Sequence, residues 1–131
     1  MKVPERVYFA ELFRKAHEAG MAAGAATTPA PMVVNKHASP LDDSSPVVKS
    51  WVVPDGVCGF AWVTIRPATS AAARYAKEFI KRGVHKGYHG GIEIMVHEFG
   101  QSLTRKEAYA RAYARVLEAA GIRATADSRI D

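Results

Sequence analysis

Residues 90–121 carry the clearest hydrophobic pattern of the chain. Apolar and polar side chains alternate over residues 92–96, as in a strand that buries one face. Gly100 ends this strand, and Thr104 and Glu107 have the spacing of a helix capping box. Apolar and small residues then recur at helical spacing as far as Gly121. The segment therefore predicts a strand, a sharp turn and an amphipathic helix.

A second amphipathic helix is predicted over residues 4–24. Its apolar stripe includes Phe9, Leu12 and Phe13, and charged side chains occupy the opposite side. Small residues follow on the apolar stripe, Gly20 among them. We expect another element to approach this end of the helix closely.

The middle of the chain predicts a long connection followed by a β-hairpin. Residues 27–50 are rich in Pro, Ser, Thr, Ala and Asp, with a short strand at 32–35. Residues 47–53 and 57–66 have the character of strands, joined by a turn at Pro54, Asp55 and Gly56. The second strand is apolar on both faces, which predicts a central position. Trp51 and Trp62 are interpreted as packing residues in the core or at its edge.

A third helix is expected from a cap at Thr69 or Ser70 to about Arg82, and a last strand over residues 123–128. The order is helix, hairpin, helix, strand, helix, strand. It predicts an α+β fold, a two-layer α/β sandwich with about four strands and three helices packed on the sheet. We expect residues 1–131 to form a single domain with a Pro/Ser-rich long loop at about 27–48.

Composition excludes several classes of protein. The fractions of 48% apolar and 24% charged residues are those of an ordinary globular protein. No apolar run approaches the roughly 18 residues of a membrane span. The start of the chain has no apolar signal segment, which predicts a cytoplasmic location. Its one cysteine, Cys58, excludes an intramolecular disulfide and a multi-cysteine zinc site.

The positive charge is concentrated in one short segment. The whole chain has a net charge of +5, and residues 66–89 hold six Lys or Arg against Glu78 alone. Basic side chains on the outer side of the expected helix, followed by a glycine-rich link with an aromatic residue, suit a phosphate backbone and a stacked base. The alternative is a solvated surface that keeps the protein soluble. The candidate residues are Lys77, Lys81, Arg82, Lys86 and Tyr88.

A second candidate is the pair Arg105 and Lys106 at the start of the helix that follows Gly100. Cations at a helix N-terminus oppose the helix dipole, so they favour an anion site built together with the free backbone amides. The alternative is that Glu107 offsets a small surface cost.

No metal site, cofactor or catalytic set is expected. His85 and His89 lie four residues apart, which in a strand is about 13 Å, too far to share one ion. A lone cysteine in a strand is most often a core residue. We therefore expect a protein that is not an enzyme.

Two resemblances add to these expectations. The turn and helix start at Ser102, Arg105 and Lys106 resemble the last strand-to-helix junction of double-stranded RNA-binding domains, which implies that these residues contact phosphates. The segments PMVV, PDGVCGFAWV, GQS with RKEAYARA, and SRID are similar to small uncharacterised proteins of tailed bacteriophages and prophages. This second resemblance implies a bacterial host cytoplasm and an accessory or anti-defence role.

The leading hypothesis is a non-enzymatic phage-type accessory protein that binds nucleic acid, DNA or RNA, or a nucleic-acid-bound host complex. The basic residues of both candidates would neutralise phosphates, and Tyr88 would stack on a base. The alternative is a protein-interaction module that docks on an acidic host or phage protein, with a homodimer as one form. In that case the apolar residues Met32, Val33 and Val34 matter more than the lysines.

Overall fold

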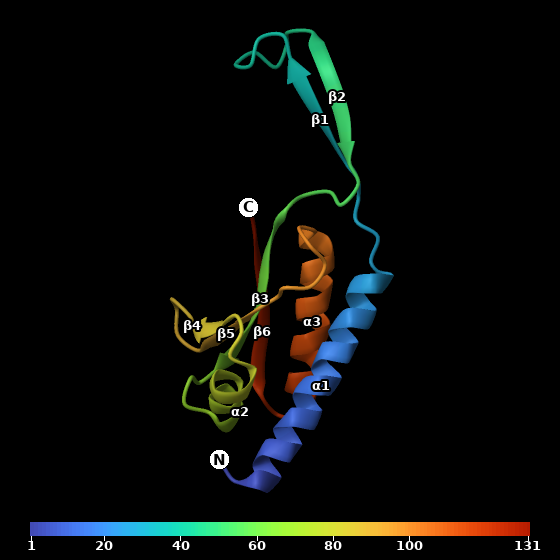
Figure 1. The fold of residues 1–131 in the computed structure, drawn as a ribbon. Coiled ribbons are helices and arrows are strands. Elements are labelled where there is room, and N and C mark those ends of the chain that lie inside the picture. Colours follow the sequence, from blue (N-terminus) through green and yellow to red (C-terminus); the bar gives the residue numbers. More distant parts are fainter.

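A computed structural model describes all of residues 1–131 (Figure 1). None of its helices is both long and apolar enough to cross a bilayer. The elements in chain order are α1 Val3–Ala26, β1 Met32–His37, β2 Val47–Val53, β3 Gly59–Arg66, α2 Ala71–Tyr75, the π-helix η1 Ala76–Ile80, β4 Val84–Lys86, β5 Ile92–Met95, α3 Leu103–Ala119 and β6 Arg123–Ile130.

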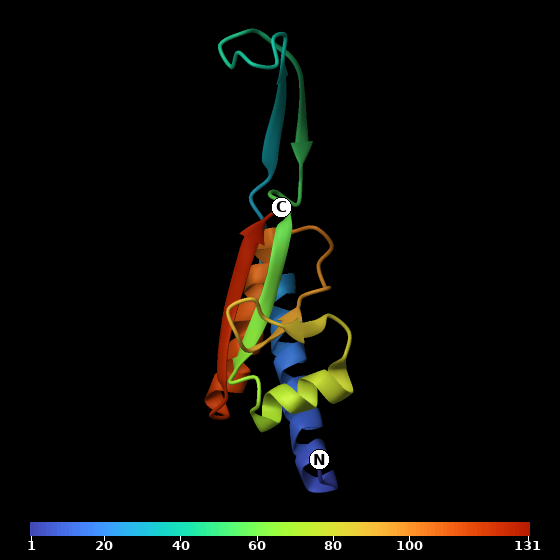
Figure 2. The same cartoon turned by 90° about the vertical axis from the view of Figure 1, so that its left-hand side faces the viewer.

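Four strands form an antiparallel sheet in the order β4-β5-β3-β6. Strand β3 is central, as its apolar character on both faces predicts. Helix α3 packs on β3 and β6, and α1 packs on α3, so the long helices lie on one side of the sheet. Figure 2 shows β6 and β3 in front of these two helices. The predicted α+β architecture of helices layered on a sheet is confirmed.

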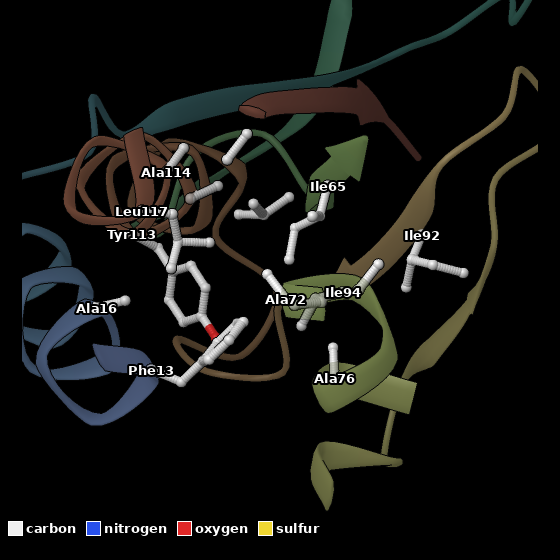
Figure 3. Packing of buried hydrophobic residues seen from close by; sticks show 14 of the residues in the cluster. Phe13, Ala16, Ile65, Ala72, Ala76, Ile92, Ile94, Tyr113, Ala114 and Leu117 are labelled. Carbon is white, nitrogen blue, oxygen red and sulfur yellow. The ribbon is translucent and has the colours of Figure 1, made fainter. Parts of the chain in front are cut away.

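The core lies between the sheet and the helices. Alternation along β3 turns Ala61, Val63 and Ile65 toward the helices, and all three are buried. They belong to one apolar cluster with Leu117 of α3 and Ile92 of β5, which are also fully buried. Figure 3 shows Ile65, Leu117 and Ile92 within this cluster. Phe60, Trp62, Thr64 and Arg66 therefore lie on the side of the sheet that the helices leave open.

Helices α1 and α3 approach each other closely at the glycines of α1. A methyl group added at Gly20 would lie 2.6 Å from the ring of Tyr109, and one added at Gly24 would lie 2.2 Å from the ring of Phe99. These distances are far below van der Waals contact, so neither position has space for a side chain. The small residues predicted to allow a close approach do so here.

The expected hairpin of residues 47–53 with 57–66 is wrong. Strand β2 pairs with β1 instead, in a register that joins Met32 to Val53 and Val34 to Trp51. Both edges of β3 are taken, by β5 and β6, so it has no free edge for β2. The turn at Gly56 does form, but it leads out of one sheet and into the other.

The β1–β2 hairpin stands away from the rest of the fold (Figures 1 and 2). It uses residues expected to be mostly loop, and the short strand predicted at 32–35 extends to His37. Its apolar side chains are open to solvent: Val33 is 61% exposed, Val52 59% and Trp51 44%. Trp51 is therefore not a core residue.

The third expected helix differs from its prediction. It begins at the Ser70 cap, whose hydroxyl accepts from the Ala73 amide, but α-helical geometry ends at Tyr75. One π-helical turn continues to Ile80, so the helix stops before Arg82. The link that follows contains an additional short strand, β4, which pairs with β5.

Gly20→Ala tests the close approach of α1 and α3. Alanine favours a helix over glycine by about 1 kcal/mol, but overpacking against the buried Tyr109 ring costs about 1–3 kcal/mol. We expect a net loss of unfolding free energy of about 1 kcal/mol in urea denaturation. Ala22→Gly, on the exposed side of the same helix, measures the propensity effect alone. A stabilised Gly20→Ala protein would show that the space between the two helices accommodates a methyl group.

Candidate nucleic-acid interface

The first candidate group lies along one continuous stretch of surface from η1 to β4. We call Lys77, Lys81, Arg82 and Lys86 the basic segment. All four side chains are exposed, and none is within ion-pair distance of a carboxylate. Elements η1 and β4 contact each other, so the segment stays in one part of the fold. These cations are free to meet an anionic partner.

A strained turn lies in the middle of the basic segment. The Arg82 amide donates to the carbonyl of Ile80 at 2.6 Å, and Lys81 between them has φ 62° and ψ −56°. This is a γ-turn with positive φ, a rare and strained conformation for any residue except glycine. It follows directly on a π-helical turn, a feature often found at functional sites. The backbone thus has an irregular helical turn and a strained residue at the point where two cations, Lys81 and Arg82, are adjacent.

Tyr88 lies at the tip of the loop between β4 and β5. It is 93% exposed, and its ring meets that of His89 edge-on with 4.9 Å between ring centroids. Gly90 and Gly91 both have positive φ, which lets the loop turn back into β5. Tyr88 therefore presents an open ring face beside the basic segment.

The open face of the sheet adjoins this loop and carries two further aromatic residues. Phe60 and Trp62 of β3 are half-buried there, on the side away from the helices. A methyl group added at Gly91 would lie 2.8 Å from Thr64 and 2.9 Å from Arg66. The base of the Tyr88 loop thus lies directly against the end of β3 at Thr64 and Arg66.

Three arginines share the open face with these aromatic residues. Arg129 of β6 lies over the Phe60 ring, 5.3 Å from its centroid. Arg66 and Arg123 are directly opposite each other on β3 and β6, and no carboxylate is in ion-pair contact with either. Like charges in facing positions destabilise a sheet, so this pair favours an anionic ligand. Asp127 and Glu93 are the acidic residues of this face, and Glu93 bonds His85 at 3.0 Å.

The predicted pair Arg105 and Lys106 does not form a joint anion site. The expected capping box at Thr104 and Glu107 is wrong: Ser102 caps the helix, its hydroxyl accepts from the Arg105 amide, and Thr104 already lies inside α3. The Arg105 side chain donates to the carbonyl of Thr27 at 3.2 Å, which ties α3 to the end of α1. Lys106 is only 7% exposed, and its ammonium lies 5.9 Å from the centroid of the Phe60 ring. The two cations thus point in different directions.

Histidine and cysteine residues do not gather into a metal centre. No group of three or more His, Cys, Asp or Glu side chains is placed to share an ion. His85 has Glu93 as its one acidic neighbour, and His89 packs on Tyr88. Cys58 is half-buried at the start of β3.

Sequence reasoning missed the open face as a candidate site. The alternation of residues 57–66 places Phe60, Trp62 and Arg66 together on one face. The expected packing of all the helices on one side of the sheet would leave that face uncovered. The signal was present, but both tryptophans were interpreted as packing residues.

Comparison with protein-family models, curated proteins and solved structures finds no match to this chain. The geometry of the residues therefore carries the functional argument by itself.

Lys81→Gly tests whether the γ-turn is strained. Positive φ at a lysine costs about 1–3 kcal/mol, and glycine removes that cost while it adds backbone entropy to the unfolded chain. We expect the unfolding free energy to rise by about 1 kcal/mol in urea denaturation. Lys77→Gly removes the same charge within η1, where glycine is expected to destabilise by about 1 kcal/mol. Equal losses of unfolding free energy in the two variants would show that the Lys81 backbone is not strained.

Proposed function

We propose that this protein is a non-enzymatic accessory protein that binds nucleic acid, in keeping with the phage-type proteins its sequence resembles. The observation that supports this most directly is the grouping of exposed cations with an open aromatic ring in one short segment. The exposed cations of the basic segment lead directly to the open Tyr88 ring, and the base of the Tyr88 loop lies against β3, whose outward side carries Phe60 and Trp62. Cations supply affinity for phosphates, and aromatic ring faces supply stacking for bases.

The preferred form of nucleic acid is a single strand. Bases in a duplex are stacked on each other and present only their edges, so an exposed ring has no base face to contact. Open sheets that bind unpaired RNA use aromatic side chains on their strands as stacking surfaces. Phe60 and Trp62 lie two residues apart on the central strand, and the loop that carries Tyr88 lies against the other end of that strand, at Thr64 and Arg66. Such stacking is tolerant of sequence, so we expect little sequence preference.

Charge reversal in the basic segment tests this function. We expect Lys81→Glu/Arg82→Glu to weaken binding to a fluorescein-labelled single-stranded oligonucleotide, measured by anisotropy across a salt series. Because each phosphate contact on a single strand contributes about 0.7 to the slope of log K against log salt, losing two should reduce the slope by about 1.4. The same series with duplex DNA and duplex RNA measures the strand preference.

The matched control is Arg111→Glu/Arg115→Glu, which makes the same charge change on the exposed side of α3. This control should leave the slope almost unchanged, because Arg111 and Arg115 lie on α3, outside the basic segment. Tyr88→Ala should instead weaken binding to a similar degree at every salt concentration, as loss of a stacking contact does. Absence of binding to single strands and to both duplexes at low salt would reject the proposal.

A second candidate function is supported by the β1–β2 hairpin. Exposed apolar side chains cover both of its faces, which is unusual on a surface that stays in water. Lys36 and Lys49 face each other on the two strands, and the Lys49 ammonium lies 5.7 Å from the Trp51 ring centroid. The apolar surface together with these facing cations fits a protein partner that is acidic and partly apolar. The chain itself has a net charge of +5, which disfavours a second copy as that partner.

Two hairpin variants test this second function. A partner cross-linked to the wild-type protein in host lysate would be purified and titrated by calorimetry. We expect Val33→Ser/Val52→Ser to abolish binding and Lys36→Glu/Lys49→Glu to make it weaker and less sensitive to salt. Lys81→Glu/Arg82→Glu serves as the control and should bind normally. Light scattering that shows a stable dimer, lost in the valine variant, would instead identify a second copy of the chain as the occupant.

A further inference from the structure

A cavity of about 280 Å³ lies between the two long helices, the end of β5 and the residues after η1. Its apolar floor comes from the sheet, through Val63, Ile94 and Val96. Aromatic rings of Phe13, Tyr109 and Tyr113 form the helical side. The volume is at the lower end of pockets that bury small ligands, about 300–1,000 Å³, so it suits a single ring system.

A polar cluster borders one side of this cavity. The Tyr109 hydroxyl and His17 Nδ1 are 2.7 Å apart, and Glu98 Oε2 lies 3.8 Å from the same nitrogen. The other carboxylate oxygen of Glu98 accepts from the His97 amide at 3.0 Å. Glu98 thereby keeps one oxygen available as an acceptor at the cavity.

Tyr113 brings an unused donor to the same cavity. The residue is only 5% exposed, yet its hydroxyl makes no hydrogen bond within the chain, and no polar atom of the fold is sealed from solvent without a partner. The hydroxyl must therefore meet the contents of the cavity. In Figure 3 the Tyr113 side chain extends from α3 toward Phe13, and its hydroxyl oxygen is on the side that faces Phe13. Burial raises the pKa of Tyr113 far above its ordinary value, so the group remains an O–H donor.

The cavity opens beside the basic segment. Arg82, the residue after the strained Lys81, is exposed and lines the cavity as well. On the other side Phe99, which follows Glu98, is the second non-glycine residue with positive φ, at 66°. Both strained residues of the chain are thus next to residues that line the cavity, as is common at ligand sites.

We propose that this cavity binds the base of one unpaired nucleotide and that the phosphate of this nucleotide contacts Arg82. The inference extends the proposed nucleic-acid function and names the part of the ligand that the cavity recognises. Aromatic and aliphatic walls suit the flat faces of a base. The Tyr113 hydroxyl donates to a ring nitrogen or carbonyl, and Glu98 accepts from a ring N–H or an amino group, which is the paired donor and acceptor pattern of a base edge. The base comes either from a strand that follows the basic segment or from a free nucleotide.

The first experiment compares an intact single-stranded oligonucleotide with a fully abasic strand of equal length. We expect Tyr113→Phe and Glu98→Gln each to weaken binding of the intact strand about threefold to tenfold, the effect of one lost hydrogen bond. Binding of the abasic strand should not change. Tyr75→Phe is the matched control, because Tyr75 stacks on Phe13 but does not line the cavity. Since the Tyr113 hydroxyl has no partner in the chain, Tyr113→Phe should fold normally in urea denaturation.

The second experiment titrates free nucleoside 5′-monophosphates, with ribose 5-phosphate as the baseless probe. Methyl-labelled protein reports on Val63, Ile94 and Val96 by NMR. Methyl shifts with the monophosphates alone, reduced by Tyr113→Phe, would identify free nucleotides as a source. Shifts with the intact strand alone would assign the site to bases within a strand.

The outcomes separate this inference from the proposed function. If both strands bind equally well and Tyr113→Phe and Glu98→Gln change neither, the protein binds nucleic acid but the cavity takes no base, and the inference is overturned. If no strand binds but monophosphates shift the cavity methyls, the base site stands and the nucleic-acid function fails. If no probe of either kind binds, both are overturned.

Discussion

The fold depends on the contact between the rings of Tyr109 and Phe99 and the bare backbone of α1. Gly20 and Gly24 leave the helix backbone bare where these rings pack, and any side chain there would overlap them. The contact sets the distance between the two long helices. It also fixes Tyr109 where its hydroxyl meets His17, and it holds the backbone around Phe99 so that Glu98 lies at the cavity. A packing constraint in the core thus determines the geometry of a polar cluster.

Strand β3 connects the two candidate binding regions. Its inward residue Val63 forms part of the cavity floor, and its outward residues Phe60 and Trp62 form the aromatic open face. The period of two in a strand places these residues on opposite sides of one sheet. Arg82 lies at the cavity, whereas the loop at Gly91 lies against the outward side of β3 at Thr64 and Arg66. The two candidate regions therefore lie on opposite faces of the same sheet.

The parts of the fold that rest on local patterns could be predicted from the sequence. Helix α1 was expected at 4–24 and is found at Val3–Ala26, because its apolar stripe and small residues are properties of the segment itself. The partner of β2 could not be predicted in the same way. Alternation indicates which face of a strand is buried but not which strand lies beside it. The choice was decided by β5 and β6, which are distant in sequence and occupy both edges of β3.

The candidate site likewise has features that local sequence patterns predict and features that depend on contacts between distant parts of the chain. The basic segment is exposed as expected, since its charges lie in a short stretch with one acidic residue. The basic pair at the start of α3 was interpreted as a unit, yet consecutive helical residues point about 100° apart. Lys106 falls in line with Ala110, Tyr113 and Leu117, the buried stripe of α3. Helical spacing alone would have assigned it to the interior. The cavity could not be predicted, because it is formed by five elements, α1, β3, η1, β5 and α3, that meet only in the folded chain.

The hairpin has a consequence for how the protein can change over evolution. Its strands bond to each other and to no strand of the main sheet, so its side chains contribute little to the cohesion of the body. Substitutions in the body are constrained by the core, whereas substitutions in the hairpin are constrained mainly by whatever contacts it. The sequence of the hairpin can therefore diverge rapidly on an unchanged scaffold, as the sequences of exposed loops do.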